Sequence, residues 1–256
     1  MGANFVEMKG ISKRFGAVTA LNNVDLKLGQ GEILGLVGDN AAGKSTLMKI
    51  LSGNYQPDSG EIIIDGNQKR FTGPIDARRF GIEMVYQDFA LIPELSVTRN
   101  IFLGREKTNR LFGIKTLDDK GMDLQAHSHL ENLGLRIPPV SSAVRELSGG
   151  QQQAVAIARA TGFDAKLVIM DEPTANLGAT AIEKVRKTIL KLKGNGIAVI
   201  IIFAQMHMML TCHRSPVFQE FENSLNNEQQ TIYKKVVYER MSLYFKGQMI
   251  GLLIGI

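Results

Sequence analysis

The chain has little of what exported and membrane-spanning proteins use. Its 256 residues contain one cysteine, Cys212, so no disulfide can form within the chain and a reducing cytoplasm is the expected compartment. The neighbouring His213 does not complete a cluster of metal ligands. The first segment, MGANFVEMKG, lacks the basic start and the apolar run of a signal peptide, so export is not expected.

Long apolar runs and internal repeats are also missing. The segment MIGLLIGI at 249–256 is apolar, but it is far shorter than the roughly 20 residues that span a bilayer. It could be a packed strand, a sticky tail or a sequence accident. Because no repeat is visible, a fusion of two similar domains is excluded.

Composition places the chain among ordinary globular proteins. With 44% hydrophobic and 21% charged residues, it can bury a core of one domain with a subdomain, or two small domains. The net charge of +5 would suit nucleic acid, an acidic lipid surface or a nucleotide. A mildly basic surface explains the same charge, so the charge does not choose a partner.

Short apolar runs alternate with helical patterns along most of the chain. Strands are expected at 5–8, 24–28, 33–37, 61–65, 82–86, 167–170 and 197–203, and helices at 45–51, from 151 and at 179–193. Between about 97 and 160 the pattern turns helical, with a break at Pro138 and Pro139. This alternation predicts a largely parallel sheet with helices on its faces. The polar segment that begins at Arg214 follows no such rhythm.

The strongest motif is GDNAAGKST at 38–46, which fits the phosphate-binding loop through Gly38, Gly43, Lys44 and Ser45. An apolar strand enters it and a helix leaves it, so backbone N–H groups converge on phosphate oxygens. Lys44 would neutralise the β- and γ-phosphates, and Ser45 would bind Mg²⁺. A chance glycine turn does not account for this combination.

A second motif, LVIMDEPT at 167–174, runs from a buried strand into two carboxylates. Asp171 can hold Mg²⁺ through a water, and Glu172 can accept a proton from the water that attacks the γ-phosphate. Alone, a solvated acidic strand end would explain the pair.

The third motif, LSGGQQQ at 147–153, leads into a helix. With it, the sequence resembles the ATP-binding-cassette (ABC) ATPases. The resemblance implies that Leu147, Ser148, Gly149, Gly150 and Gln151 complete the ATP site of the opposite protomer in a head-to-tail dimer. Ser148 as an ordinary helix cap is compatible with that role.

The resemblance extends over roughly residues 5–213 and implies further site residues. Phe15 matches the aromatic residue that stacks on adenine; taken alone, it would be interpreted as a core residue. Gln87 matches the glutamine that contacts Mg²⁺ and the attacking water. The implied catalytic residues are Glu172, Lys44 and Gln87, and the implied Mg²⁺ ligands are Ser45, Gln87 and Asp171. The implied nucleotide-binding residues are Phe15, Gly38, Asn40, Ala41, Gly43, Lys44, Ser45, Thr46 and those at 147–151.

The resemblance also implies a fold. It is an α/β P-loop NTPase core with a mainly parallel sheet, an N-terminal antiparallel β-subdomain and an inserted helical subdomain. The expected boundaries are 1–88 with 162–213 for the core and β-subdomain, and 89–161 for the helical subdomain that carries the signature. Residues 214–256 form an atypical tail that stays unassigned.

Two segments are most similar in sequence to the ATPase subunits of bacterial sugar importers. They are DARRFGIEMVYQDFALIPELSVTRNIFLGRE and DEPTANLG. This implies ATP and Mg²⁺ as ligands and transmembrane permease subunits as partners. A homodimer or a second cassette, and indirectly a solute-binding protein, are also implied. The implied location is the cytoplasmic face of the membrane, as a peripheral subunit.

Three positions depart from the family pattern. Ala41 stands where glycine is common, which costs about 1–2 kcal/mol if the residue needs a positive φ. Gly178 replaces an aspartate, although relatives in sugar importers share the glycine. Ala204 stands where the resemblance places a histidine that contacts the γ-phosphate, and His207 is about 4.5 Å further along if the chain is helical there.

Three functions are therefore compatible with the sequence. The first is an ATPase subunit that drives import of a small solute, in which a monosaccharide is implied by resemblance. The second is an ATP-binding module with little turnover, because of Ala204 and Ala41. The third is a cassette ATPase that acts on nucleic acid or ribosomes, for which the expected coiled coil or second cassette is missing.

Overall fold

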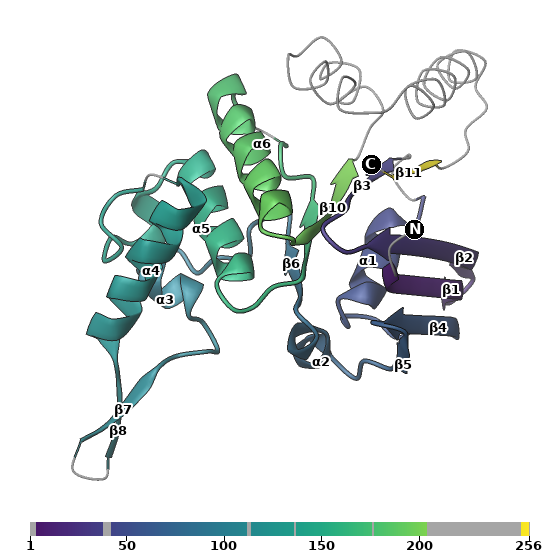
Figure 1. Ribbon diagram of the computed structural model, residues 1–256, viewed down its shortest axis with the longest axis horizontal. Coiled ribbons are helices and arrows are strands. Elements are labelled where there is room, and N and C mark those ends of the chain that lie inside the picture. The colour runs from purple at the N-terminus through teal and green to yellow at the C-terminus, as the bar shows by residue number, and fades with distance from the viewer. Residues whose placement is uncertain are drawn as a thin grey trace.

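The fold is described from a computed structural model that covers residues 4–37, 42–111, 114–135, 137–175, 177–203 and 252–255. Its centre is a five-stranded sheet, and a separate four-stranded sheet and a group of helices lie beside it (Figure 1).

The strands of the central sheet lie in the order β11 (Leu252–Gly255), β3 (Ile33–Val37), β10 (Ala198–Phe203), β9 (Leu167–Asp171) and β6 (Ile82–Val85). The last four strands are mutually parallel, and β11 pairs antiparallel with β3 at the edge. These parallel strands are apolar except for Glu83 in β6 and Asp171 at the end of β9, because both faces of the sheet are covered.

The strands alternate their side chains between two hydrophobic clusters, one on each face of the sheet. In β9, Leu167 and Ile169 belong to the first cluster, and Val168 and Met170 belong to the second. The first cluster contains the buried side of α1 (Lys44–Leu51). The second contains the buried residues of α5 (Gly149–Thr161), so α1 and α5 pack on opposite faces of the sheet.

The second sheet is antiparallel and contains β2 (Val18–Gly29), β1 (Asn4–Phe15), β4 (Ser59–Ile64) and β5 (Asn67–Lys69), in that order. The first two strands were expected to be short. They are longer because their partly exposed ends continue to pair, through register shifts between Met8 and Lys13. The inward side chains of this sheet join the first cluster.

The remaining helices lie on the face of the central sheet that carries the second cluster, or at the edge of the sheet (Figure 1). They are α2 (Pro74–Arg79), α3 (Val97–Ile101), α4 (Asp119–Leu133), the short 3₁₀ turn η1 (Val144–Glu146), α5 (Gly149–Thr161) and α6 (Ala179–Gly194). Among the described residues, no helix has the length and apolar character needed to cross a membrane.

One expectation about residues 97–160 was wrong. The segment is not helical throughout, because β7 (Thr108–Leu111) and β8 (Ile114–Leu117) form an antiparallel hairpin between α3 and α4. The hairpin has no alternation of apolar and polar residues that would reveal it, since no face of it is buried. At the other end, 252–255 forms a strand that pairs with β3, so of the three interpretations left open for MIGLLIGI the strand is the one that agrees with the structure.

The expected fold is otherwise confirmed. The described chain has a mainly parallel α/β core, an antiparallel β-subdomain near its start and a helical region between β6 and β9. Residues 204–250 lie outside the described residues, which includes most of the tail from 214.

Candidate functional site

The carboxyl ends of the parallel strands bring the motifs to one edge of the sheet. Register pairs Phe203 with Val37 and Ile202 with Asp171, so β3, β10 and β9 end at the same level. The neighbouring strand β6 ends at Val85, which pairs with Met170, and Gln87 follows two residues later. Ligands of open α/β sheets bind in the crevice outside such strand ends.

At this edge α1 begins without a side-chain cap. Gly43 is its N-cap residue, with a left-handed φ of 81°, and no side chain accepts a hydrogen bond there. The Gly43 carbonyl receives the N–H of Leu47 at 2.9 Å, which starts the helix. The first N–H groups of a helix point out of its N-terminus, where the helix dipole favours an anion.

Gly43 must be glycine for a second reason. A Cβ at this position would lie 2.4 Å from the backbone oxygen of Ala20 and 2.8 Å from Cδ2 of Leu21. The start of α1 is therefore held directly against β2, and no side chain fits between them.

Two carboxylates leave β9 in different environments. Burial raises the pKa of Asp171, and this is opposed by a hydrogen bond from Ser45 and the charges of Lys49 and Lys44. Burial also raises the pKa of Glu172, with a further contribution from the negative charge of Asp171. The surroundings of each carboxylate thus disfavour its charged form.

Glu172 is held in an unusual conformation. Its φ is 49°, in the left-handed region, and its N–H donates to the carbonyl of Ile202 at 3.0 Å. Its Oε2 accepts a hydrogen bond from Nε2 of Gln87 at 3.0 Å. The hydrogen bond brings together residues that are 85 positions apart, one after β6 and one after β9.

These residues fit a nucleotide with a hard divalent cation. The hydroxyl of Ser45, the carboxylate of Asp171 and the carboxamide of Gln87 all offer the oxygen ligands that Mg²⁺ prefers. A bound cation would favour the charged form of the Asp171 carboxylate, whose pKa burial raises. The uncapped start of α1 supplies N–H groups for the phosphates.

Phe15 stands at the end of β1 as an exposed aromatic side chain. Its side chain is 44% exposed, so Phe15 is not a core residue, which was the interpretation of this phenylalanine taken alone. The ring meets that of Tyr55 edge to face, with centroids 5.3 Å apart, and Tyr55 is itself 37% exposed. Together they form an accessible aromatic surface on the β-subdomain.

Asp58 fixes this aromatic surface to the chain that follows α1. Its Oδ1 accepts from Nζ of Lys13 and its Oδ2 accepts from the N–H of Arg14, each at 2.7 Å. The N–H of Asp58 in turn donates to the carbonyl of Ser12 at 2.9 Å. These hydrogen bonds lower the pKa of Asp58. Residues 12–15 are thereby held beside the loop that carries Tyr55.

The signature residues surround the start of α5. Ser148 is the N-cap residue, and the carboxamide oxygen of Gln151 accepts from the N–H of Ser148 at 2.9 Å in a capping box. A Cβ on Gly149 would meet nothing within 4 Å. Ser148, Gly150 and Gln151 also line a cavity of about 180 Å³ between α5 and α6. These residues are on the opposite face of the sheet from α1, so one chain does not bring the two glycine motifs together.

Sequence reasoning missed the residues that connect α5 to the catalytic edge. Arg159 donates from Nη1 to the carbonyl of Ala90 at 2.7 Å and from Nη2 to that of Phe89 at 2.8 Å. Both acceptor residues have left-handed φ values, 46° and 60°. The buried Gln153 donates to the carbonyl of Pro173, just after Glu172. Only the folded chain reveals these contacts, because the partners are far apart in sequence.

Several expected site residues cannot be placed. Gly38, Asn40 and Ala41 of the phosphate loop, and Ala204 after β10, lie outside the described residues. Among the described residues, Thr46 belongs to the first turn of α1, and Leu147 is buried in the second cluster beneath the start of α5.

A P-loop edge with acidic residues after β9 and a separate signature helix defines a class of ATPase, and comparison with known proteins agrees. The profile of the ABC transporter family matches residues 21–175. The chain belongs to this family and is an ATP-binding cassette of the ATPase type.

Its curated relatives are import proteins. It is 46% identical over 200 residues to the xylose/arabinose import ATP-binding protein XylG of Sulfolobus acidocaldarius, covering 78% of each chain. It is also 46% identical to the fructose import ATP-binding protein FrcA of Rhizobium meliloti, covering 77% of this chain and 78% of that one. A ribose import ATP-binding protein of Rubrobacter xylanophilus is 45% identical, but only 38% of its length is covered.

Solved structures agree in fold. A nucleotide-free ATP-binding cassette from an ABC transporter superposes with a TM-score of 0.70 at 26% identity, over 82% of this chain and 85% of that one. A bacterial ABC transporter cassette solved as a dimer gives a TM-score of 0.66 at 26% identity, over 79% and 89% of the two chains.

Proposed function

We propose that this chain is the ATP-hydrolysing subunit of an importer for a small sugar. The observation that carries the proposal is the shared strand edge, where the uncapped start of α1 and the pair Asp171 and Glu172 meet. The relatives named for xylose, arabinose, fructose and ribose import support a monosaccharide as the solute.

In this proposal each residue at the edge has one task. Lys44 and the first N–H groups of α1 bind the β- and γ-phosphates of ATP, and Phe15 stacks on adenine. Ser45, Asp171 and Gln87 hold Mg²⁺, which would neutralise developing charge on the phosphates when bound. Glu172 accepts the proton of the attacking water, and its hydrogen bond to Gln87 orients the carboxylate.

The signature residues act on the ATP of a partner protomer. Because α1 and α5 pack on opposite faces of the sheet, Ser148, Gly149 and Gly150 need a second cassette to approach a nucleotide. The related cassette solved as a dimer supports this arrangement. The partner is a second copy of this chain or a different cassette.

The remaining partners follow from import. Transmembrane permease subunits would carry the solute and a solute-binding protein would deliver it, so the chain would act as a peripheral subunit at the cytoplasmic face of the membrane. The proposed boundaries are 1–88 with 162–213 for the core and β-subdomain, and 89–161 for the helical subdomain. The end of α5 at Thr161 supports the second boundary.

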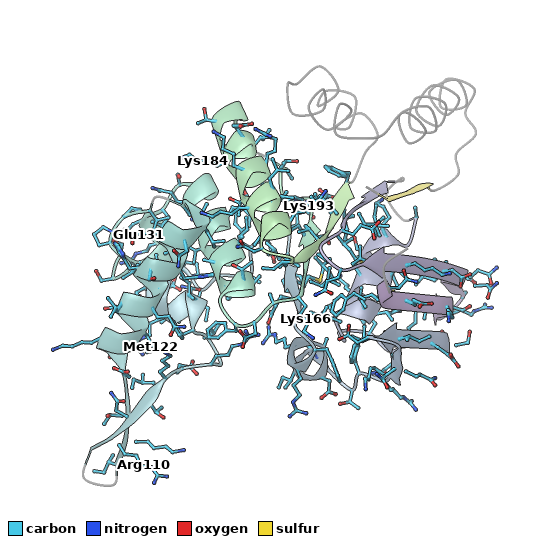
Figure 2. The ribbon with its side chains drawn as sticks, in the orientation of Figure 1. Arg110, Met122, Glu131, Lys166, Lys184 and Lys193 are labelled. Atoms are coloured by element: carbon cyan, nitrogen blue, oxygen red, sulfur yellow. The ribbon has the colours of Figure 1, made fainter. Side chains whose placement is uncertain are left out.

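Reconstitution with its permease tests the proposal. Vesicles that contain the chain, the permease and the solute-binding protein should take up labelled xylose, ribose or fructose when ATP is supplied. Lys44→Ala should abolish both uptake and phosphate release. Lys166→Ala, a surface lysine on the core that pairs with Asp65 at 3.4 Å, is the matched control and should leave both unchanged (Figure 2). Phosphate release without uptake of any of these sugars would refute sugar import while leaving the ATPase assignment in place.

The dimer is tested separately. In a Glu172→Gln background, ATP with Mg²⁺ should accumulate a dimer detectable by light scattering, and adding Ser148→Arg should remove it. Because Ser148 is remote from the chain's own phosphate loop, the double variant should still bind ATP as tightly as Glu172→Gln alone. A dimer that survives Ser148→Arg would contradict the head-to-tail arrangement.

A further inference from the structure

Within the part of the chain that the structure describes, the hairpin formed by β7 and β8 has no face covered by another element. It extends away from α3 and α4, and Figure 2 shows the side chain of Arg110 near its far end. Every side chain described in its two strands is exposed, including Ile114 at 68% and Leu117 at 41%. An isolated two-stranded hairpin is marginally stable in water, so a surface that covers it would stabilise it.

The base of the hairpin is nevertheless firmly attached. The N–H of Asp118 donates to the carbonyl of Lys107 at 2.9 Å and closes the base. The N–H of Lys107 points to the sulfur of Met122 at 3.4 Å, and Met122 is fully buried in the second cluster. The hairpin therefore leaves the body in a direction set by the first turn of α4.

The hairpin segment carries positive charge that its own acids do not neutralise. Glu106 accepts from the N–H of Gly104, Asp118 caps α4, and Asp119 pairs with Arg99 at 2.7 Å. Within the described residues, no ion pair involves the segment's exposed cations Lys107, Arg110, Lys115 and Lys120.

Two of these cations face each other across the strands. Arg110 is the register partner of Lys115, and Leu117 lies on the same face as a partner of Thr108. Like charges directly opposite each other in a sheet are destabilising. A negatively charged surface against this face would remove the repulsion and cover Leu117 at the same time.

We propose that this hairpin binds anionic phospholipid headgroups at the membrane surface. The inference rests on the proposed function, since an importer's ATPase subunit works beside a bilayer. Basic side chains next to exposed aliphatic ones are the composition of an interfacial membrane contact. Arg110 and Lys115 contact phosphate groups, while Leu117 on the same face reaches the boundary of the acyl chains.

Charge favours lipid over the permease as the occupant. Cytoplasmic loops of membrane proteins carry an excess of Lys and Arg, so a basic hairpin would meet like charge on them. The cytoplasmic leaflet, in contrast, has a negative surface potential that attracts each nearby Lys or Arg with about 1 kcal/mol.

Vesicle co-sedimentation of the full chain tests the proposal. One set of vesicles contains phosphatidylcholine alone, and the other contains three parts phosphatidylcholine to one part phosphatidylglycerol. The parent chain should bind only the second set, and added salt should weaken the binding. Arg110→Ala with Lys115→Ala should lower the affinity about twenty-five-fold, which is two cations at about fivefold each.

A matched variant and two further measurements make the test specific. Lys27→Ala with Arg70→Ala removes two exposed cations from the β-subdomain, and this variant should bind as the parent does. Arg110→Lys should keep most of the vesicle affinity that Arg110→Ala loses, because the headgroups are attracted by the charge of the side chain and not by its shape. Since alanine at 110 and 115 removes a repulsion, loss of binding cannot be assigned to an unfolded hairpin, and circular dichroism would check this.

The outcomes separate this proposal from the proposed function. ATP binding by the same samples should be equal in parent and hairpin variants, and if the parent binds no ATP the proposed function fails instead. Equal binding of the parent to both vesicle sets would overturn the lipid proposal. So would a hairpin variant that binds vesicles like the parent, or one that loses only its association with the purified permease.

Discussion

The two helix starts that the sequence assigns to phosphate, at α1 and at α5, are built in opposite ways. The start of α1 has a left-handed glycine as N-cap residue and no capping side chain. The start of α5 is closed by a capping box between Ser148 and Gln151. An uncapped helix needs an external anion for its first N–H groups, whereas a capped helix is complete without one.

This difference between the two helix starts indicates how two protomers can bind one nucleotide. The uncapped start of α1 is a site that gains from binding phosphate even in a single chain. The capped start of α5 is stable without phosphate. In our proposal it contacts a phosphate only when another protomer presents one. In our proposal, ATP therefore binds first to α1 and only then recruits the α5 of the partner.

Alanine at the two glycines should give the largest contrast. Gly43→Ala places a Cβ 2.4 Å from the oxygen of Ala20 at a φ of 81°, so the start of α1 must move. We expect a loss of about 1–2 kcal/mol in unfolding free energy and at least roughly a hundredfold loss in ATP affinity. Gly149→Ala meets nothing within 4 Å and should leave both values nearly unchanged. Calorimetry and chemical denaturation measure the two effects, and similar losses in both variants would contradict the comparison.

Removing the base should stop turnover without touching either helix start. Glu172→Gln keeps the size of the side chain but cannot accept the proton of water, so phosphate release should fall by about 10²–10³ while ATP affinity is retained. A phosphate-release assay and equilibrium binding on one preparation measure both. Gln87→Ala, which removes the 3.0 Å hydrogen bond to Glu172, should cause a smaller loss. Unchanged turnover in Glu172→Gln would remove this residue from the mechanism.

Ala204 stands where the resemblance to ABC ATPases places a histidine that contacts the γ-phosphate. Residue 204 directly follows Phe203, which pairs with Val37 at the end of the strand that enters the phosphate loop. Ala204→His should add a donor to the γ-phosphate and raise phosphate release at least about tenfold. The gain should disappear when Glu172→Gln is added. Equal rates for the parent and Ala204→His would mean that alanine at this position does not limit turnover.

The smallest expected effect concerns the aromatic surface, for which α5 has no counterpart. Asp58→Ala removes the bonds that hold residues 13 and 14, so Phe15 should be less well positioned and ATP affinity should fall a few fold. Affinity for inorganic tripolyphosphate, which has no base, should not change. Asp76→Ala, which removes an aspartate hydrogen-bonded to the N–H and hydroxyl of Thr72, is the control. An equal loss for both ligands would show that Asp58 acts on the phosphate side.

The sequence predicted the central sheet well because its strands are buried on both faces. The expected strands at 33–37 and 167–170 correspond to β3 and β9 within one residue. The hairpin was missed because neither face is buried, so no periodicity marks it. Helix α5 begins two residues before the expected position, because a capping box outweighs the low helix propensity of Gly149 and Gly150.

The site was predictable where chemistry is local and not where it depends on topology. Residues 42–46 form a local unit of loop and helix, so motif spacing was enough. The pairing of Gln87 with Glu172 and the contact of Phe15 with Tyr55 required the strand order and the position of the β-subdomain. Spacing alone contains no information about either.

The contact of Arg159 with the carbonyls of Phe89 and Ala90 has a consequence for the timing of motions in this protein. It fastens α5 to the two residues that follow the Gln87 region, with bonds of 2.7 and 2.8 Å. The segment after Gln87 and the signature helix should therefore open to solvent as one cooperative unit, with amide protons that exchange at a common rate. Any rotation of α5 would then reach the Gln87 side chain through only two residues of backbone.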